Sequence, residues 1–493
     1  MDMKTKKKMV DEKFSDDLTL ESEFNALEPD EFLYDRRGPW PQPSPNHPFG
    51  EAPGVLHIPF SEQFHWWMKI GTRYVKDWFT YWPVAMAKAA SWGGLSPVSD
   101  EEFANYYYNS CYSKFFTFEL TDKVQELFKD YLEDGKTYCV CDFVGMKVLQ
   151  PIHGVFCEPS ITLFEVLEDG VKPVAINLRD YVIDDTDGDL WMLGKYISLQ
   201  AAGNHIIVAT HPRLHFPMDS INAITKTAVP KSHILFQLLY PHFELTLKLD
   251  YQVLNNPISL LRNEWWMIYA PFPATGESMR DLVVLGYHGL QDNPAYPKYF
   301  YPLKGPQKVR SNYGDFHDGY YKVYFNFVKE VLKEIPHGDK FVTRWANYIH
   351  QEIPTFPNGE EIWKEDNFAH AVASYMWDVT LGHAADHKTY AEIPINKNPL
   401  RLRIPSPKYK TPGYKLDYSN AVTIIDQTKL IMANKLFFAP TNVSNMIDVN
   451  YDFSLPILNQ HVKSFKSALK EHEANLKTPN FMPVGQIPAS IQY

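Results

Sequence analysis

The stretch 380-TLGHAADHKTYAEIP-394 carries the pattern on which the interpretation of this sequence depends. His383 and His387 are four residues apart, within a proline-free run over residues 361–390 that is typical of a long helix. Positions i and i+4 of a helix lie on one face, so two imidazoles at this spacing can bind one metal ion. Such a pair is also common on an ordinary polar helix face. The pair therefore supports a metal site only if a second group of ligands accompanies it.

A second pair lies earlier, in 205-HIIVATHPRLHFPMD-219, where His211 and His215 have the same spacing. Pro212 lacks a backbone N–H, and we expect it to distort the helix at this point. Four imidazoles converging from two helices would form a transition-metal site, because imidazole suits iron, copper, zinc and manganese. A zinc hydrolase would need a glutamate base in an HExxH motif, and neither pair contains one.

Composition excludes several classes of protein. The chain has 493 residues, of which 45% are hydrophobic and 22% charged, as in an ordinary soluble globular protein. A net charge of −11 offers no basic surface for nucleic acid. No stretch is apolar over the roughly 18 residues that a transmembrane helix needs, so we expect no stable membrane insertion. Four cysteines are too few for a disulfide framework, and we expect reduced thiols and a cytoplasmic location.

The chain divides into an N-terminal arm and one large domain. Residues 1–55 are polar and then proline-rich, which predicts an extended, partly disordered arm. Residues 56–493 predict a single, mainly helical domain, and short β-favouring runs within 137–182 predict a small sheet. Ser99 and Glu102 form a capping-box pattern. The runs with helical periodicity are 61–82, 99–110, 189–210, 218–230, 232–252, 317–334, 339–352, 361–388 and 457–476.

Further segments, taken in order, resemble one family, the lipoxygenases, from about residue 100 to the end. Two segments precede the first histidine pair, one lies between the pairs, and two follow the second pair. In the third of them, His233 and His242 have the family's spacing. The segments are 173-PVAINL-178, 191-WMLGK-195, 233-HILFQLLYPHFELT-246, 392-EIPINKNPLRLRIPSP-407 and 481-FMPVGQIPASIQY-493.

The resemblance implies a fold, a cofactor and an activity. Lipoxygenases are non-haem iron, sometimes manganese, dioxygenases of polyunsaturated fatty acids. The family's ion cycles between Fe(II) and Fe(III), a hydrogen atom leaves a bis-allylic methylene, and O2 adds to the resulting radical. The implied partners are one small apolar unsaturated substrate and O2, and we expect a monomer. The segment before residue 60 is too short and too rich in proline for the family's lipid-binding β-barrel, so we expect the catalytic domain alone. The implied ligands are His211, His215, His383, His387 and the terminal carboxylate of Tyr493.

The sequence departs from the family pattern at five places. The first histidine pair is spaced i,i+4 where the family usually has i,i+5, with His205 as the alternative ligand. The fourth ligand is His387, where Asn is common, and the last residue is Tyr493, where the family has Ile or Val. Val253 stands at the oxygen-steering position, usually Ala or Gly, and Leu254 replaces the arginine that follows it. These changes favour a remodelled substrate pocket.

Other polar residues have a supporting role in this interpretation. We expect His205, His233 and His242 to be packed or hydrogen-bonded behind the ligands. Arg401 and Arg403 could meet a substrate carboxylate, although an internal ion pair is the favoured interpretation.

Three functional hypotheses follow. The first is a lipoxygenase-type oxygenase whose default substrate is a polyunsaturated fatty acid. The second keeps the metal but oxidises, cleaves or rearranges a different compound, such as a polyene, a phenol or another specialised metabolite. The third is a metal-free scaffold protein that retains the fold.

Overall fold

The computed structural model describes residues 34–35, 54–55, 64–246, 261, 269–306, 308–440 and 443–491. Of the predicted N-terminal arm, it describes only the paired two-residue strands β1 (Tyr34–Asp35) and β2 (Gly54–Val55). Three predicted site residues, Val253, Leu254 and Tyr493, lie outside the described residues.

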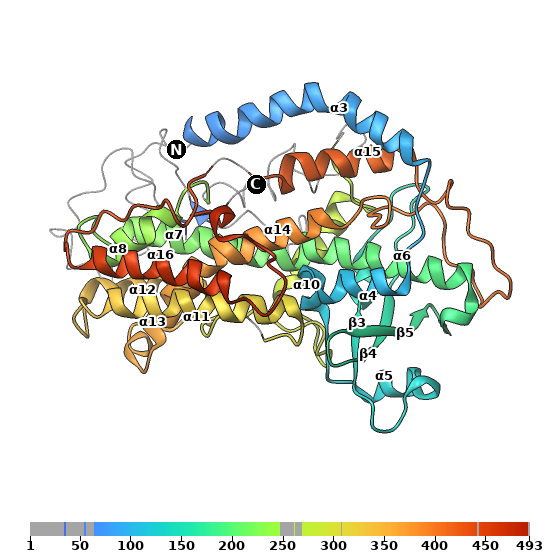
Figure 1. Cartoon of the computed structure of the whole chain (residues 1–493), viewed down its shortest axis with the longest axis horizontal. Helices are drawn as coiled ribbons and strands as arrows, with labels where there is room; N and C mark the ends of the chain where they lie inside the picture. Colours follow the sequence, from blue (N-terminus) through green and yellow to red (C-terminus); the bar gives the residue numbers. More distant parts are fainter. Residues whose placement is uncertain are drawn as a thin grey trace.

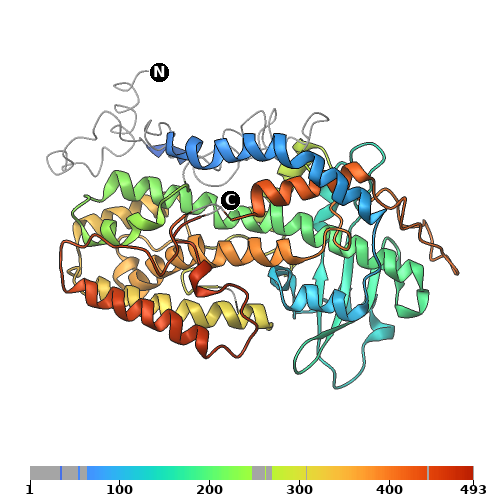
Figure 2. The ribbon, with the colours of Figure 1, turned by 45° about the horizontal axis from the view of Figure 1, so that its top comes forward.

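Helices form most of the described body, as the sequence predicts (Figure 1). Two broken helices, α6 to α7 and α13 to α14, run through its interior. Helix α11 packs on α13 and α16, α12 packs on α7, and α3 packs on α15. Figure 2 shows α3 and α15 stacked above the interior helices. The helices are α3 (Thr72–Trp92), α4 (Asp100–Tyr108), α5 (Asp122–Leu127), α6 (Asp189–Asn204), α7 (Phe216–Ala228), α8 (Ile234–Leu239), α10 (Gly276–His288), α11 (Asn312–Leu332), α12 (Lys340–Glu352), α13 (Asn367–Trp377), α14 (His383–Glu392), α15 (Ile424–Ala433) and α16 (Leu458–Ala474).

The predicted small sheet is present at one end of the body. Its strands are β3 (Tyr138–Asp142), β4 (Ser160–Val166), β5 (Val171–Leu178) and β6 (Tyr181–Ile183), antiparallel and in chain order. Residues Cys139, Leu163 and Ala175, one from each of the first three strands, are fully buried. The sheet packs against α4 and α6, and so supports the start of the first interior helix.

Local sequence signals explain several helix starts. Ser99 caps α4 in the predicted capping box with Glu102. A second capping box, Thr423 with Asp426, starts α15. Helices α15 and α10 both lie outside the runs whose periodicity predicts a helix. Of the predicted helix over 232–252, the described residues form α8 followed by the 3₁₀ turn η9 (Tyr240–His242), because Pro241 cannot continue the α-helical hydrogen bonds. Residues 247–252 lie outside the described residues.

Both interior helices contain a π-helical segment. In the first, η7 (His205–Thr210) is π-helical and is followed by the 3₁₀ turn η8 (His211–Leu214). In the second, η12 (Asp378–Gly382) separates α13 from α14. The predicted continuous helix over 361–388 is wrong in this detail: the α-helix begins at Asn367, after a 3₁₀ turn, and contains this insertion. Because π segments are rare and concentrate at functional sites, the residues that directly follow them are candidate site residues.

In the part of the chain that the structure describes, no helix is both long enough and apolar enough to cross a membrane.

Candidate metal centre

The two interior helices bring the four predicted ligand histidines together. His211 begins η8 and His215 directly follows it, while His383 begins α14 and His387 lies one turn later. Candidate ligand atoms of the four imidazoles all lie within 4.8 Å of one another, and three of the rings are buried. Pro212 follows His211 in the 3₁₀ turn, so the predicted distortion of the first helix is present.

The Nε2 atoms of the four imidazoles converge on one point. The Nε2–Nε2 distances are 3.0 Å from His383 to His215, 2.9 Å from His215 to His211 and 2.7 Å from His211 to His387. A hydrogen bond between two imidazoles needs one protonated and one unprotonated nitrogen. An Nε2 atom with two Nε2 neighbours therefore cannot form a good hydrogen bond with both of them. A shared cation satisfies all four lone pairs at once.

The donor set suits a transition-metal ion, because imidazole nitrogens are ligands of iron, manganese, copper and zinc.

Electrostatics keep these imidazoles in the form that binds metals. Burial lowers the pKa of His215, His383 and His387 well below the usual value, and the neighbouring imidazoles lower it further. Burial also lowers the pKa of His211, although Asp386 opposes this effect. Neutral imidazoles have a free lone pair, which is the state that coordinates an ion.

Asp386 lies behind the cluster, in a role that no sequence pattern indicates. Its buried carboxylate accepts a hydrogen bond from Lys114 Nζ at 2.6 Å and one from the Tyr313 hydroxyl at 2.7 Å. Its Oδ2 lies 3.7 Å from Nδ1 of His211. Burial alone would raise the pKa of Asp386, but Lys114 and His211 outweigh it and hold the pKa well below the ordinary value. A carboxylate behind a ligand histidine fixes the orientation of the ring.

The other predicted histidines lie outside the cluster. His205 Nδ1 contacts the Ala201 carbonyl at 2.9 Å and its Nε2 contacts the Tyr296 hydroxyl at 3.0 Å, so both nitrogens have partners away from the four Nε2 atoms. His233 caps α8 by accepting from the Leu235 N–H, and its other nitrogen lies 3.4 Å from Asp339.

His242 connects the core to the C-terminal segment. Its Nδ1 contacts the Ala489 carbonyl at 2.5 Å, and its Nε2 lies 3.0 Å from the Tyr451 hydroxyl. The Ser490 hydroxyl donates to the His242 carbonyl at 2.8 Å, and Ile491 is fully buried. The C-terminal segment therefore enters the interior as far as the described residues reach.

Arg401 and Arg403 both contact one carboxylate. Arg401 Nη1 lies 3.2 Å from Asp426 Oδ1, and Arg403 donates to both Asp426 oxygens at 2.8 Å. The favoured ion-pair interpretation of these residues agrees with this geometry.

Comparison with known proteins identifies the fold. No protein-family model and no curated protein sequence matches the chain. Among solved structures, the lipoxygenase variant Delta413-417:GS LOX matches with a TM-score of 0.63 and 16% identity, over 80% of this chain and 66% of its own. A calcium-dependent 11R-lipoxygenase matches with a TM-score of 0.64 and 16% identity, over 80% of this chain and 65% of its own. A fungal lipoxygenase from Fusarium graminearum matches with a TM-score of 0.60 and 17% identity, over 79% of this chain and 77% of its own.

The chain thus has the fold of a lipoxygenase catalytic domain, as the sequence motifs predict. It spans about two thirds of the length of the first two of these structures. A structural match at about 16% identity shows the fold alone, so activity and substrate must be argued from the site.

Proposed function

We propose that the chain is a lipoxygenase-type oxygenase with one non-haem iron ion, for which manganese is the alternative. His211, His215, His383 and His387 would hold the ion, together with the terminal carboxylate of Tyr493. The observation that carries this proposal is the convergence of four neutral imidazoles inside a lipoxygenase fold. When bound, such an ion supplies one-electron chemistry between Fe(II) and Fe(III).

The residues of the chain would perform the remaining tasks. The buried imidazoles hold an ion in a site shielded from bulk water, and Asp386 orients His211 through Nδ1. The protein also has to hold one C–H bond of the substrate toward the site and admit O2 to one face, which is a positioning task. Val253 and Leu254, which the sequence places at the pocket, would take part in this selection.

A polyunsaturated fatty acid is the default substrate. One structural neighbour was solved in complex with arachidonate, which supports this class of substrate by analogy. The partners would then be one apolar unsaturated molecule and O2.

A second candidate function is oxidation, cleavage or rearrangement of a different apolar metabolite at the same metal centre. The contact of both Arg401 and Arg403 with Asp426 favours it, because these arginines then neutralise an internal carboxylate. A substrate without a carboxylate at that end needs neither of them. The scaffold hypothesis is disfavoured by the four converging imidazoles.

Metal content and oxygen uptake test the proposal. Full-length protein should contain close to one iron or manganese per chain, and His383→Ala should lose it. An oxygen electrode then compares linoleate and arachidonate with polyenes and phenols. Oxygen uptake with a fatty acid and formation of a conjugated diene support the first function, and uptake only with another compound supports the second. If the wild-type chain stays without metal after Fe(II) is added, only the scaffold hypothesis remains.

The remaining sequence predictions concern location and assembly. All four cysteines are free thiols, three of them buried, which fits the proposed cytoplasmic compartment. The monomeric state stays a prediction, for which light scattering in solution is the measurement.

A further inference from the structure

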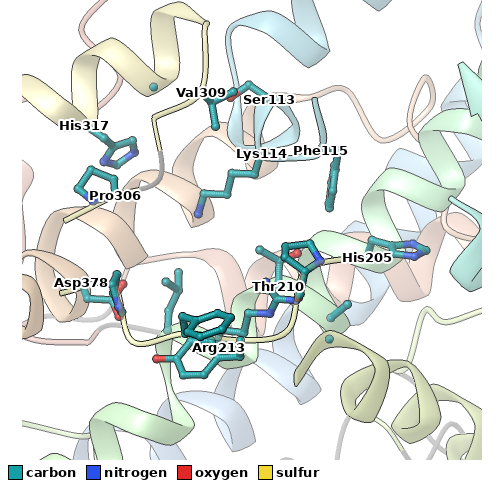
Figure 3. A pocket seen from close by; sticks show the side chains of 18 of the residues that line it. Ser113, Lys114, Phe115, His205, Thr210, Arg213, Pro306, Val309, His317 and Asp378 are labelled. Atoms are coloured by element: carbon teal, nitrogen blue, oxygen red, sulfur yellow. The ribbon is translucent and has the colours of Figure 1, made fainter. Parts of the chain in front are cut away.

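A second feature of the interior is a cavity of about 440 Å³ beside the metal centre (Figure 3). Its walls come from the 3₁₀ turn η3 (Cys111–Phe115), from η8, from loop residues within 295–306 and Val309, from α11, and from the junction of α13 and η12. None of the four clustered histidines lines it. The cavity is therefore separate from the histidine cluster in its lining residues.

The size and lining of the cavity suit a small organic molecule. Ligand pockets typically enclose about 300–1,000 Å³ and are lined mainly by apolar and aromatic side chains with a few polar groups. Here Phe115, Tyr299, Tyr301 and Trp377 provide flat aromatic walls. Phe300, in the same lining, is 64% exposed, so an apolar ring also stands at the rim.

Several polar groups in the lining have no partner in the described part of the protein. They are both ring nitrogens of His317, both carboxyl oxygens of Asp378 and the indole nitrogen of Trp377. All three side chains are more than nine-tenths buried. Since more than about 90% of buried polar groups are hydrogen-bonded, their concentration around one cavity indicates a polar ligand. In Figure 3, His317 and Asp378 flank the open space.

The charge of the lining favours an anion. Arg213 donates one long hydrogen bond, from Nη2 to the Pro297 carbonyl at 3.4 Å, and its Nε is buried without a partner. Figure 3 shows it across the cavity from Lys114. Lys114 already pairs with Asp386, and Lys298 adds an exposed cation at the rim.

The lining also contains the acidic side chains Asp378 and Asp142 and the imidazole of His317. Burial raises the pKa of Asp378 well above its ordinary value, which favours the protonated carboxyl group, a form that can donate a hydrogen bond. Burial lowers the pKa of His317 to about 3, so the ring is neutral near pH 7 and also offers one donor. Asp142 already accepts from Asn293 at 3.0 Å and from the Val144 N–H at 2.8 Å.

We propose that this cavity is a second binding site, for a small aromatic organic anion. Its flat apolar body packs between Tyr299 and Trp377, and its carboxylate or phosphate group accepts hydrogen bonds from Arg213 and His317. The site does not include the histidine cluster, so its occupancy does not depend on the proposed metal function.

Calorimetric titration of the full chain tests binding with defined probes. We use cinnamate, phenyl phosphate and the neutral analogue cinnamyl alcohol. One molecule of cinnamate or phenyl phosphate should bind per chain, at least about tenfold more tightly than the alcohol. The relative affinities of the first two probes distinguish a carboxylate from a phosphate ligand. If neither anion binds at millimolar concentration, the proposal is wrong.

Variants locate the site. Val309→Trp fills the cavity and should abolish binding of all probes. Arg213→Met should weaken binding of the two anions at least about tenfold and leave binding of the alcohol unchanged. His317→Leu removes two unpartnered buried nitrogens without disturbing a hydrogen bond, and it should weaken the anions in a chain that remains folded by circular dichroism. The matched control is Lys304→Met, an exposed lysine outside the lining, which should bind like the wild type. Undiminished anion binding in both Val309→Trp and His317→Leu would place the ligand elsewhere and overturn the proposal.

Discussion

Asp386 links the candidate metal site to two distant parts of the chain. It lies between the two histidines of α14 in sequence, but its side chain points to partners from other parts of the chain. Lys114 is 272 residues away and Tyr313 is 73 residues away. No local pattern could reveal these contacts, so the sequence predicts the four imidazoles and misses the carboxylate that lies behind one of them.

Replacing this carboxylate should weaken metal binding. Asp386→Asn removes the negative charge facing Nδ1 of His211 and leaves Lys114 without its ion pair. Loss of such a supporting group costs about 10–100-fold in metal affinity. Competition with a chelator of known affinity measures the change. The control is Asp366→Asn, which breaks a half-exposed ion pair with Lys329. Unchanged affinity in Asp386→Asn would show that His211 needs no support.

His242 should make stability depend on pH. Burial lowers its pKa to about 4 in the folded protein, from about 6.5 in an unfolded chain. As the pH falls through this window, the unfolded chain takes up a proton that the folded chain does not, so stability is lost. The loss is about 1.4 kcal/mol per pH unit, or about 3 kcal/mol over the window.

The variant His242→Gln cannot titrate there, and its amide offers both a donor and an acceptor. Its free energy of unfolding, measured with urea, should therefore fall less between pH 7 and pH 4.5. The exposed imidazole of His153 provides the matched control, His153→Gln, which should follow the wild type. Identical pH dependence in all three proteins would contradict the assignment.

At the scale of elements, the sequence predicts regular structure well and irregular structure poorly. Periodicity locates α11, α12 and α16, and β-favouring runs locate the sheet. The segments η7 and η12 are each one widened turn within a helix, and such an insertion leaves the local hydrophobic pattern almost unchanged. Each lies directly before a histidine pair, and a widened turn changes the direction in which the following residues point around the helix axis.

The 3₁₀ turn η8 should be needed to orient His211 relative to His215. Pro212 lies in the turn, its carbonyl accepts from the His215 N–H at 3.1 Å, and the Tyr287 hydroxyl donates to the same carbonyl at 2.7 Å. Pro212→Ala restores a backbone donor and permits an ordinary α-helical turn, which would rotate His211 relative to His215. We expect roughly tenfold weaker metal binding, about 1.4 kcal/mol, with little change in the unfolding of the metal-free chain. Chelator competition and urea denaturation measure the two quantities. Equal affinity would mean that surrounding packing alone fixes the turn.

At the scale of the whole molecule, the site joins parts of the chain that are far apart. His211 and His387 are separated by 176 residues, and their helices meet in the interior. Motif order and spacing predict this fold, because the family resemblance supplies the topology that periodicity lacks. Composition and periodicity alone would give only a large helical protein. The cavity beside Arg213 has no sequence motif, since its lining comes from many separate segments.

Metal binding should therefore stabilise the whole fold. An ion that binds only the folded chain contributes about 2.7 kcal/mol at 100 times its dissociation constant. Removing the metal with a chelator should lower the melting temperature by a few degrees, and Fe(II) should restore it. His383→Ala should show no shift on adding Fe(II). The same shift in wild type and variant, measured by scanning calorimetry, would indicate binding away from the cluster.

The most direct test of the central claim is X-ray absorption at the iron edge on the purified full-length protein. We predict about six nitrogen or oxygen neighbours at roughly 2.1 Å, no sulfur, and scattering from about four imidazole rings. In His383→Ala this imidazole signal should be reduced or the metal lost. A sulfur shell, or an imidazole signal unchanged by His383→Ala, would contradict the claim that these four histidines form the metal centre.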